Sequence, residues 1–211
     1  MEHQRAFPTN IFIGDDFINS LEGPEYTDGL IQGMKKHIEK LWIKRDKNKS
    51  NFQTHPFLCN EKEFVPLADL ILKNNLKNMK TLKYNVELDD LVMSGMWANI
   101  ISPGESHRAH THSNNLWSGV YYLHSDQNAG ITFQDPRPAA DVLVPRKLEH
   151  TTENSNLLLY ASKTNRAIMF PSWLMHWVKT NTSKSNRISI SWNIHIKGQM
   201  GEHHDLQSAI Y

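Results

Sequence analysis

The sequence contains very little cysteine: Cys59 is the only one in 211 residues. A single thiol cannot form a disulfide within the chain, and it cannot build a zinc site from several thiolates. Any metal ion must therefore be bound through nitrogen and oxygen ligands. The simplest interpretation of a chain without internal disulfides is a cytoplasmic protein.

Strong charge and long apolar runs are also missing. The 23 basic residues nearly balance the 22 acidic ones, and the formal charge of +1 gives no argument for a nucleic-acid partner. No apolar run approaches the length of about 18 residues that indicates a membrane-spanning helix. The segment Met1–Pro8 has no apolar stretch after its charges, so we expect no secretory signal there.

The pattern of apolar residues changes near residue 90. Before it, apolar residues recur at helical spacing over 27–45 and 62–84, and 11–13 could form a short strand. After it, the pattern is short and alternating, with tight turns between segments, which is typical of a β-sandwich or barrel. The expected strands are 92–101, 108–112, 117–124, 129–134, 157–161, 166–170, 175–180 and 187–196.

We expect residues 1–211 to form a single domain. Within it, residues 1–90 should be a mostly helical support, 91–197 the β core and 198–211 a polar tail. The polar segment Asp46–Thr54 is expected to be a loop.

Histidine is the residue type that carries the most chemical information, and three of the twelve lie in the segment 107–112. Residues two apart on a strand face the same way, so His110 and His112 should point together and His107 away from them. Two imidazoles on one face can occupy adjacent positions around a metal ion. The same spacing also occurs by chance on exposed strands, so the motif alone leaves both interpretations open.

A further histidine, His176, lies among aromatic and aliphatic residues shortly after the Pro171–Ser172 turn. One interpretation is a core histidine that is hydrogen-bonded to a backbone carbonyl. The other is a third metal ligand from a distant strand, which a double-stranded barrel could bring to its open end.

The segment 187–196 alternates strictly, with isoleucines and Trp192 on one face. Its polar face could simply meet water, or it could form the wall of a wet cavity. In a cavity, Arg187 would suit a carboxylate, because its planar guanidinium offers two parallel hydrogen bonds, and Ser189 could add a hydroxyl.

In this order, the motifs resemble those of the 2-oxoglutarate and Fe(II)-dependent oxygenase superfamily, and within it the prolyl-hydroxylase-like branch. The resemblance covers roughly residues 90–197. It is carried by Gly104, His107–His112, Ser118–Leu123, Gly130–Phe133, Asp135–Arg137, Phe170–Ser172 with His176, and Arg187–Ser189.

The resemblance implies a mainly β protein with N-terminal helices, whose core is a double-stranded β-helix, or cupin-like jelly roll, with iron at its open end. It implies His110 as the first metal ligand and His176 as the distal one. Fe(II) and 2-oxoglutarate would be the cofactor and the co-substrate. 2-Oxoglutarate has one carboxylate far from the metal, and the resemblance implies that Arg187, Ser189 and Tyr122 bind it. Asn99 would line the same cavity.

One position departs from the family pattern, because His112 stands where a carboxylate is usual. His112 could itself be the ligand, Asp135 could supply the carboxylate, or the position could be left to water, chloride or substrate. We favour His112, since imidazole is a suitable ligand for iron. Asn193 and Ser191 are among the candidates for fixing the imidazole tautomers.

The implied activity is a dioxygenase that converts 2-oxoglutarate to succinate and hydroxylates a C–H bond of a peptide or small metabolite. Two other functions stay open: a three-histidine cupin-type dioxygenase that does not use 2-oxoglutarate, and a non-enzymatic jelly-roll binding domain. We expect small-molecule partners and O2, no nucleic acid and no membrane, and a homodimer is possible.

Overall fold

The computed structural model describes residues 1–4, 6–21, 23–46, 51–127, 130–137, 139, 142–202 and 206–211. No helix in these ranges is both long and apolar enough to cross a membrane. The helices are α1 (Gly23–Ile43) and α2 (Val65–Thr81). The strands are β1 (Phe12–Gly14), β2 (Phe52–Gln53), β3 (Leu91–Ile101), β4 (His107–His110), β5 (Trp117–His124), β6 (Ile131–Gln134), β7 (Leu157–Tyr160), β8 (Ala167–Pro171), β9 (His176–Val178), β10 (Arg187–Ile196), β11 (Gln199–Met200) and β12 (Ala209–Ile210).

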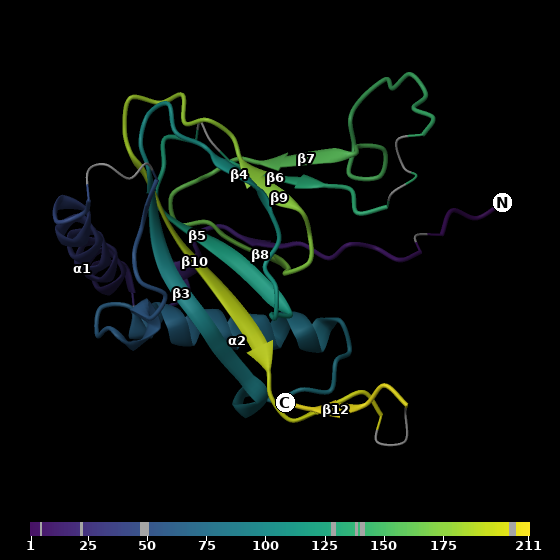
Figure 1. Ribbon diagram of the computed structural model, residues 1–211, viewed down its shortest axis with the longest axis horizontal. Helices are drawn as coiled ribbons and strands as arrows, with labels where there is room; N and C mark the ends of the chain where they lie inside the picture. Colours follow the sequence, from purple (N-terminus) through teal and green to yellow (C-terminus); the bar gives the residue numbers. More distant parts are fainter. Residues whose placement is uncertain are drawn as a thin grey trace.

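Two antiparallel sheets form the β core (Figure 1). The larger sheet has the strand order β1-β8-β5-β10-β3-β2, and the smaller sheet has the order β4-β9-β6-β7. From β3 to β10 the chain passes back and forth between the two sheets, which is the winding of a double-stranded β-helix. The expected fold class, mainly β with N-terminal helices and a jelly-roll core, is confirmed.

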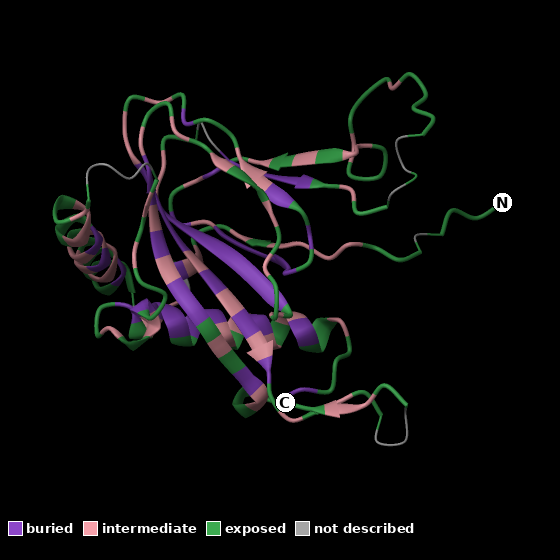
Figure 2. Cartoon of the chain, viewed as in Figure 1, coloured by how far each residue is buried: buried purple, intermediate pink, exposed green. Residues whose placement is uncertain are grey.

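The two helices pack against one face of the larger sheet (Figure 1). The strict alternation of β10 explains which face this is, because its isoleucines and Trp192 lie in one buried cluster with Met34 and Ile38 of α1 and Leu67 and Ile71 of α2. Figure 2 colours β5 as buried along almost its whole length, and β10 partly as buried and partly as intermediate. The polar face of β10 is consequently turned toward the smaller sheet, as a cavity wall requires.

A second apolar cluster lies between the two sheets. Tyr122 and Phe170 from the larger sheet meet Ile131 and Phe133 from the smaller one, and all four are almost completely buried. This cluster seals the interior of the roll beside the polar face of β10.

Close contact between β5 and β10 depends on Gly119. A Cβ atom at this position would lie 2.1 Å from a ring carbon of Trp192 and 2.7 Å from the backbone oxygen of Ile168. Only glycine therefore fits beneath the indole, and β5 and β10 are held in fixed register.

The sequence predicts β5 and β10 to the residue, whereas the shortest strands are missed. Within the expected loop 46–54, β2 pairs with β3, and within the expected polar tail β11 pairs with β12. These two-residue strands have no alternating pattern of their own and are formed by pairing. Residues 47–50 of that loop, residue 129 of the expected strand 129–134 and residues 203–205 of the tail lie outside the described residues.

The division of the chain into three parts stays a prediction. Residues 1–90 contribute two strands to the larger sheet, β1 and β2, in addition to the expected helices. The hydrophobic cluster under the larger sheet runs without interruption from α1 and α2 to β10.

Candidate metal centre and its cavity

Three histidines converge between the sheets at the ends of neighbouring strands. His110 is the last residue of β4, His176 is the first of β9, and the two are paired across the ladder. Together with His112 they offer one nitrogen each, and these nitrogens lie within 4.8 Å of one another. In the part of the chain that the structure describes, no other three histidine, cysteine, aspartate or glutamate side chains gather in this way.

The position of His112 in this group has a different structural cause from the predicted one. The expected strand 108–112 ends at His110, so the alternation of a strand does not place His112. Its backbone N–H instead donates a hydrogen bond to the carbonyl oxygen of Ser172, over 2.9 Å. That contact ties the segment after β4 to the turn that precedes His176.

The hydrogen bonds of the three imidazoles fix their tautomers. Each Nδ1 faces an oxygen that can only accept: the carbonyl of Arg108 at 2.8 Å from His110, the carbonyl of Leu174 at 2.8 Å from His176, and the Asn193 side-chain oxygen at 2.6 Å from His112. Nδ1 therefore carries the proton, and the lone pair of each Nε2 is available.

The spacing of these lone pairs suits one metal ion. The Nε2 atoms of His110 and His112 are 3.2 Å apart. Imidazole nitrogens bind a divalent ion such as zinc at about 2.0–2.1 Å, so two ligands at right angles around one ion lie about 3 Å apart. The donor set and its spacing fit a metal ion bound by nitrogen.

Of the candidates for fixing an imidazole, Asn193 contacts His112. Its side-chain oxygen also accepts a hydrogen bond from the Ser118 hydroxyl at 2.7 Å, which holds the amide in one orientation. Ser191 has a different contact, because its hydroxyl accepts a hydrogen bond from Asn99 at 3.2 Å.

Burial keeps two of these imidazoles neutral. It lowers the pKa of His176 to about 3, and it also lowers the pKa of His112, although the hydrogen bond to Asn193 opposes that effect. Metal ions bind the neutral form of histidine, so these rings are in the binding form at neutral pH.

The low pKa of His176 predicts how the stability of the metal-free protein depends on pH. An unfolded histidine takes up a proton near pH 6.5, whereas the folded one does so only near pH 3. The free energy of unfolding should therefore fall as the pH drops through this window, by up to about 1.4 kcal/mol per pH unit for one such histidine. Urea unfolding after chelator treatment should show this slope, and a weaker slope in His176→Leu. Equal slopes would contradict the prediction.

The imidazoles border a cavity of about 60 Å³ whose opposite wall belongs to three adjacent strands. Asn99, Ser189 and Tyr122 are aligned across β3, β10 and β5, and all three line the cavity. Arg187, two residues before Ser189, lines it as well. The structure thus brings to one wall the four residues expected at the co-substrate.

This wall presents hydrogen-bond donors to an anion. Arg187 is only 5% exposed, and its guanidinium carbon lies 5.9 Å from the centre of the Tyr122 ring. Burial raises the pKa of Tyr122 to about 12, so its hydroxyl keeps its proton. Burial lowers the pKa of Arg187, but the ordinary pKa of a guanidinium is so high that Arg187 stays cationic. No described residue makes a hydrogen bond of normal geometry to the buried Tyr122 hydroxyl, although the backbone of Ile131 is near it. A carboxylate would satisfy this donor.

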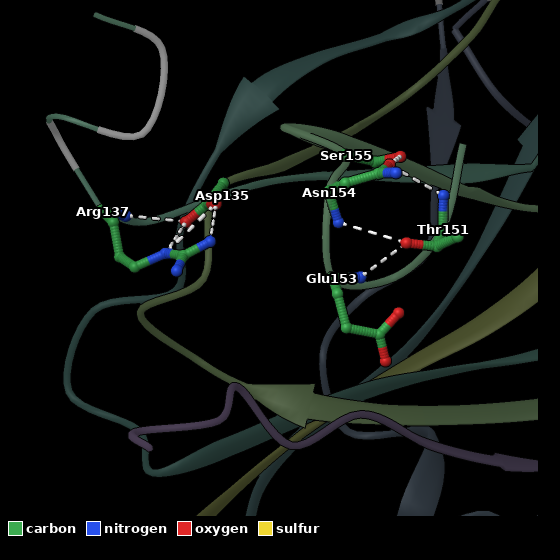
Figure 3. A network of polar contacts seen from close by, with 6 residues as sticks. All are labelled: Asp135, Arg137, Thr151, Glu153, Asn154 and Ser155. Carbon is green, nitrogen blue, oxygen red and sulfur yellow. Dashed lines mark hydrogen bonds and ion pairs between the residues drawn. The ribbon is translucent and has the colours of Figure 1, made fainter. Parts of the chain in front are cut away.

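Asp135 does not join the metal ligands. Figure 3 shows its carboxylate held by Arg137, whose Nε and Nη2 atoms donate over 3.0 and 2.6 Å. This ion pair lowers the pKa of Asp135. Within the described ranges, no aspartate or glutamate lines the cavity. The geometry therefore gives no support to the alternative in which Asp135 supplies a carboxylate ligand. The sequence already contains the reason, because Arg137 follows Asp135 by two residues and can pair with it.

Among the residues of the cavity that sequence reasoning missed are His107 and Trp97. His107 was expected to face away from His110, but the β4–β9 ladder shifts register between them, and both rings face inward. The indole of Trp97 on β3 lies 5.9 Å from the His112 ring, measured between centroids. Neither could be found from local alternation, since each depends on a partner strand.

The sequence and the fold are both similar to those of known proteins. Residues 95–193 match a family model described as "Putative 2OG-Fe(II) oxygenase". No curated protein matches the sequence. Among solved structures, HygX from Streptomyces hygroscopicus, crystallised with nickel and 2-oxoglutarate, has a TM-score of 0.58 at 12% identity, over 96% of this chain and 91% of HygX.

A second solved structure shares the same fold. The non-heme alpha ketoglutarate dependent epimerase SnoN from nogalamycin biosynthesis has a TM-score of 0.60 at 8% identity, over 94% of this chain and 81% of SnoN. The prolyl-hydroxylase-like branch stays a prediction. The matched segment contains the three convergent histidines and the buried Arg187, so the β core of this chain is similar to the 2-oxoglutarate and Fe(II)-dependent oxygenases that the family model describes.

Proposed function

We propose that this protein is a dioxygenase that uses Fe(II), 2-oxoglutarate and O2, with His110, His112 and His176 as the metal ligands. The observation that carries the proposal is a single cavity with three available Nε2 atoms on one wall and the buried Arg187 on the other. A co-substrate that has a chelating group at one end and a carboxylate at the other matches these two walls.

Arg187 would bind the carboxylate of 2-oxoglutarate far from the metal. Its planar guanidinium suits a carboxylate, to which it can donate two parallel hydrogen bonds. Tyr122 would donate a further hydrogen bond from its buried hydroxyl, and Ser189 and Asn99 would complete the polar wall. The likeness to HygX, which was crystallised with 2-oxoglutarate, supports this assignment.

Iron suits a site of neutral imidazoles, which also bind zinc, copper and nickel. When bound, Fe(II) supplies the redox chemistry by which O2 converts 2-oxoglutarate to succinate and CO2 and oxidises a second substrate. The chain's own residues have other tasks. Asn193 and the Leu174 carbonyl orient the imidazoles, and Phe170 and the apolar cluster around it keep water from the interior.

Hydroxylation of a C–H bond is the outcome that we propose for a peptide or small-metabolite substrate. The related fold of SnoN, an epimerase, shows that the outcome has to be measured separately. A three-histidine dioxygenase that does not use 2-oxoglutarate would leave Arg187, Ser189 and Tyr122 without a task. A non-enzymatic jelly roll would not need three imidazoles that each offer a nitrogen within 4.8 Å of the others.

Anaerobic titration tests the proposal. Fe(II) should bind at one equivalent per chain, and subsequent 2-oxoglutarate should bind in one further equivalent with a visible charge-transfer band. Admission of O2 should then release succinate and CO2 in equal amounts, even slowly and without the second substrate. Metal binding without any 2-oxoglutarate binding would favour the cupin-type alternative, and no metal binding would favour the non-enzymatic one.

A further inference from the structure

A fourth imidazole, that of His107, faces the cavity, and a defect in the strand pairing puts it there. The β4–β9 ladder pairs His107 with Val178 and His110 with His176, so three steps along β4 match two along β9. The extra residue is a β-bulge, and it turns two side chains three positions apart to the same side. Bulges of this kind weaken a ladder locally, and they often direct a side chain into a functional site.

The contacts of His107 place it beside the metal ligands without making it one of them. Its ring packs edge-on against His110, with centroids 4.6 Å apart and planes at 84°. Its nitrogens are not part of the close group formed by the other three histidines. His107 and Arg187 line the same cavity.

The nitrogens of His107 have no hydrogen-bond partner among the residues that the structure describes. Each of the three convergent histidines has an oxygen partner at Nδ1, whereas no described residue hydrogen-bonds to the His107 ring. A half-buried imidazole that faces a polar cavity retains one N–H donor for a ligand. None of the described residues that line the cavity has a carboxylate that could accept from it.

We infer that His107 is a further binding residue for the co-substrate, and that its imidazole N–H donates a hydrogen bond to a carboxylate of 2-oxoglutarate. The inference rests on the proposed function, because it assumes that 2-oxoglutarate occupies this cavity. His107 would then complete a set of donors around the anion together with Arg187 and Tyr122. The β-bulge would be the structural means by which the fold adds this donor.

Two variants of His107 test the inference in the Fe(II)-loaded protein under anaerobic conditions. His107→Leu removes the donor, and His107→Gln keeps an N–H donor. Calorimetry should give a Kd for 2-oxoglutarate that is roughly 10- to 100-fold higher in the leucine variant, since a hydrogen bond to a charged group typically has that effect. The glutamine variant should recover most of the affinity, and the Kd for Fe(II) should stay unchanged in both. The exposed His150, replaced by leucine, is the matched control and should change neither constant.

Three results would overturn the inference: unchanged affinity for 2-oxoglutarate in His107→Leu, equally weak binding in the glutamine variant, or a parallel loss of Fe(II) affinity, which would make His107 a metal ligand. Failure of the unaltered protein to bind 2-oxoglutarate is a different outcome. It would contradict the proposed function itself, so the two failures are distinguishable.

Discussion

Replacement of His176 with alanine should abolish tight metal binding. His176 is 4% exposed, it is fixed by the Leu174 carbonyl, and it is the only convergent histidine that does not come from the segment around β4. Loss of groups that merely orient a ligand typically weakens metal affinity by about 10- to 100-fold, so loss of the ligand itself should exceed roughly 100-fold. Competition with a chromophoric chelator would measure the change.

Two comparisons make the His176 result specific. His55→Ala, at an exposed histidine on the segment beside β3, should leave the metal affinity unchanged. The far-ultraviolet circular dichroism of metal-free His176→Ala should match that of the unaltered metal-free protein, which excludes unfolding as the cause. Retained tight binding in His176→Ala would show that the metal is held elsewhere.

Replacement of Arg187 with methionine should remove 2-oxoglutarate binding and spare the metal. Truncating one partner of a buried, hydrogen-bonded charge pair costs about 2–5 kcal/mol, which corresponds to roughly 30- to 4000-fold in Kd. Methionine keeps much of the arginine volume and removes a buried charge, so the fold should remain stable. Calorimetric titration of the Fe(II)-loaded variant with 2-oxoglutarate would measure the effect.

Arg187→Lys separates geometry from charge. Lysine keeps the positive charge but offers no planar pair of donors, so it should restore only part of the affinity. The truncated analogue 2-oxobutyrate lacks the second carboxylate, and it should bind the unaltered protein and Arg187→Met about equally. If Arg187→Met binds 2-oxoglutarate normally, the far carboxylate does not lie at this wall.

The sequence predicts the elements whose local pattern is strong. The bounds of β10 follow from its strict alternation, and those of β5 from a continuous apolar run between turns, so the wall that carries Arg187, Ser189 and Tyr122 is predictable. The order of the histidine motifs likewise predicts that His110 and His176 are neighbours. The information on the two strands lies within about ten consecutive residues, whereas the information on the histidines lies in the order of motifs far apart in the sequence.

Other features depend on contacts that no local pattern contains. The orientation of His107 is set by its pairing with β9, about seventy residues later in the chain, and the position of His112 by the Ser172 carbonyl. The choice of Asn193 as the partner of His112 was one of several that the sequence left open. It follows from the register of β10 with its neighbours, which only the folded molecule specifies.

Because of the alternation of β10, the same strand register is needed for a stable fold and for an intact cavity. Every second residue of this strand belongs to the hydrophobic cluster beside the helices, and three of the residues between them, Arg187, Ser189 and Ser191, line the cavity. A slip of one position against β3 or β5 would exchange the two sets, burying a guanidinium under the helices and filling the cavity with isoleucine. Such a misaligned chain would lose its stability and its chemistry together, so a partly active, misregistered population should not accumulate.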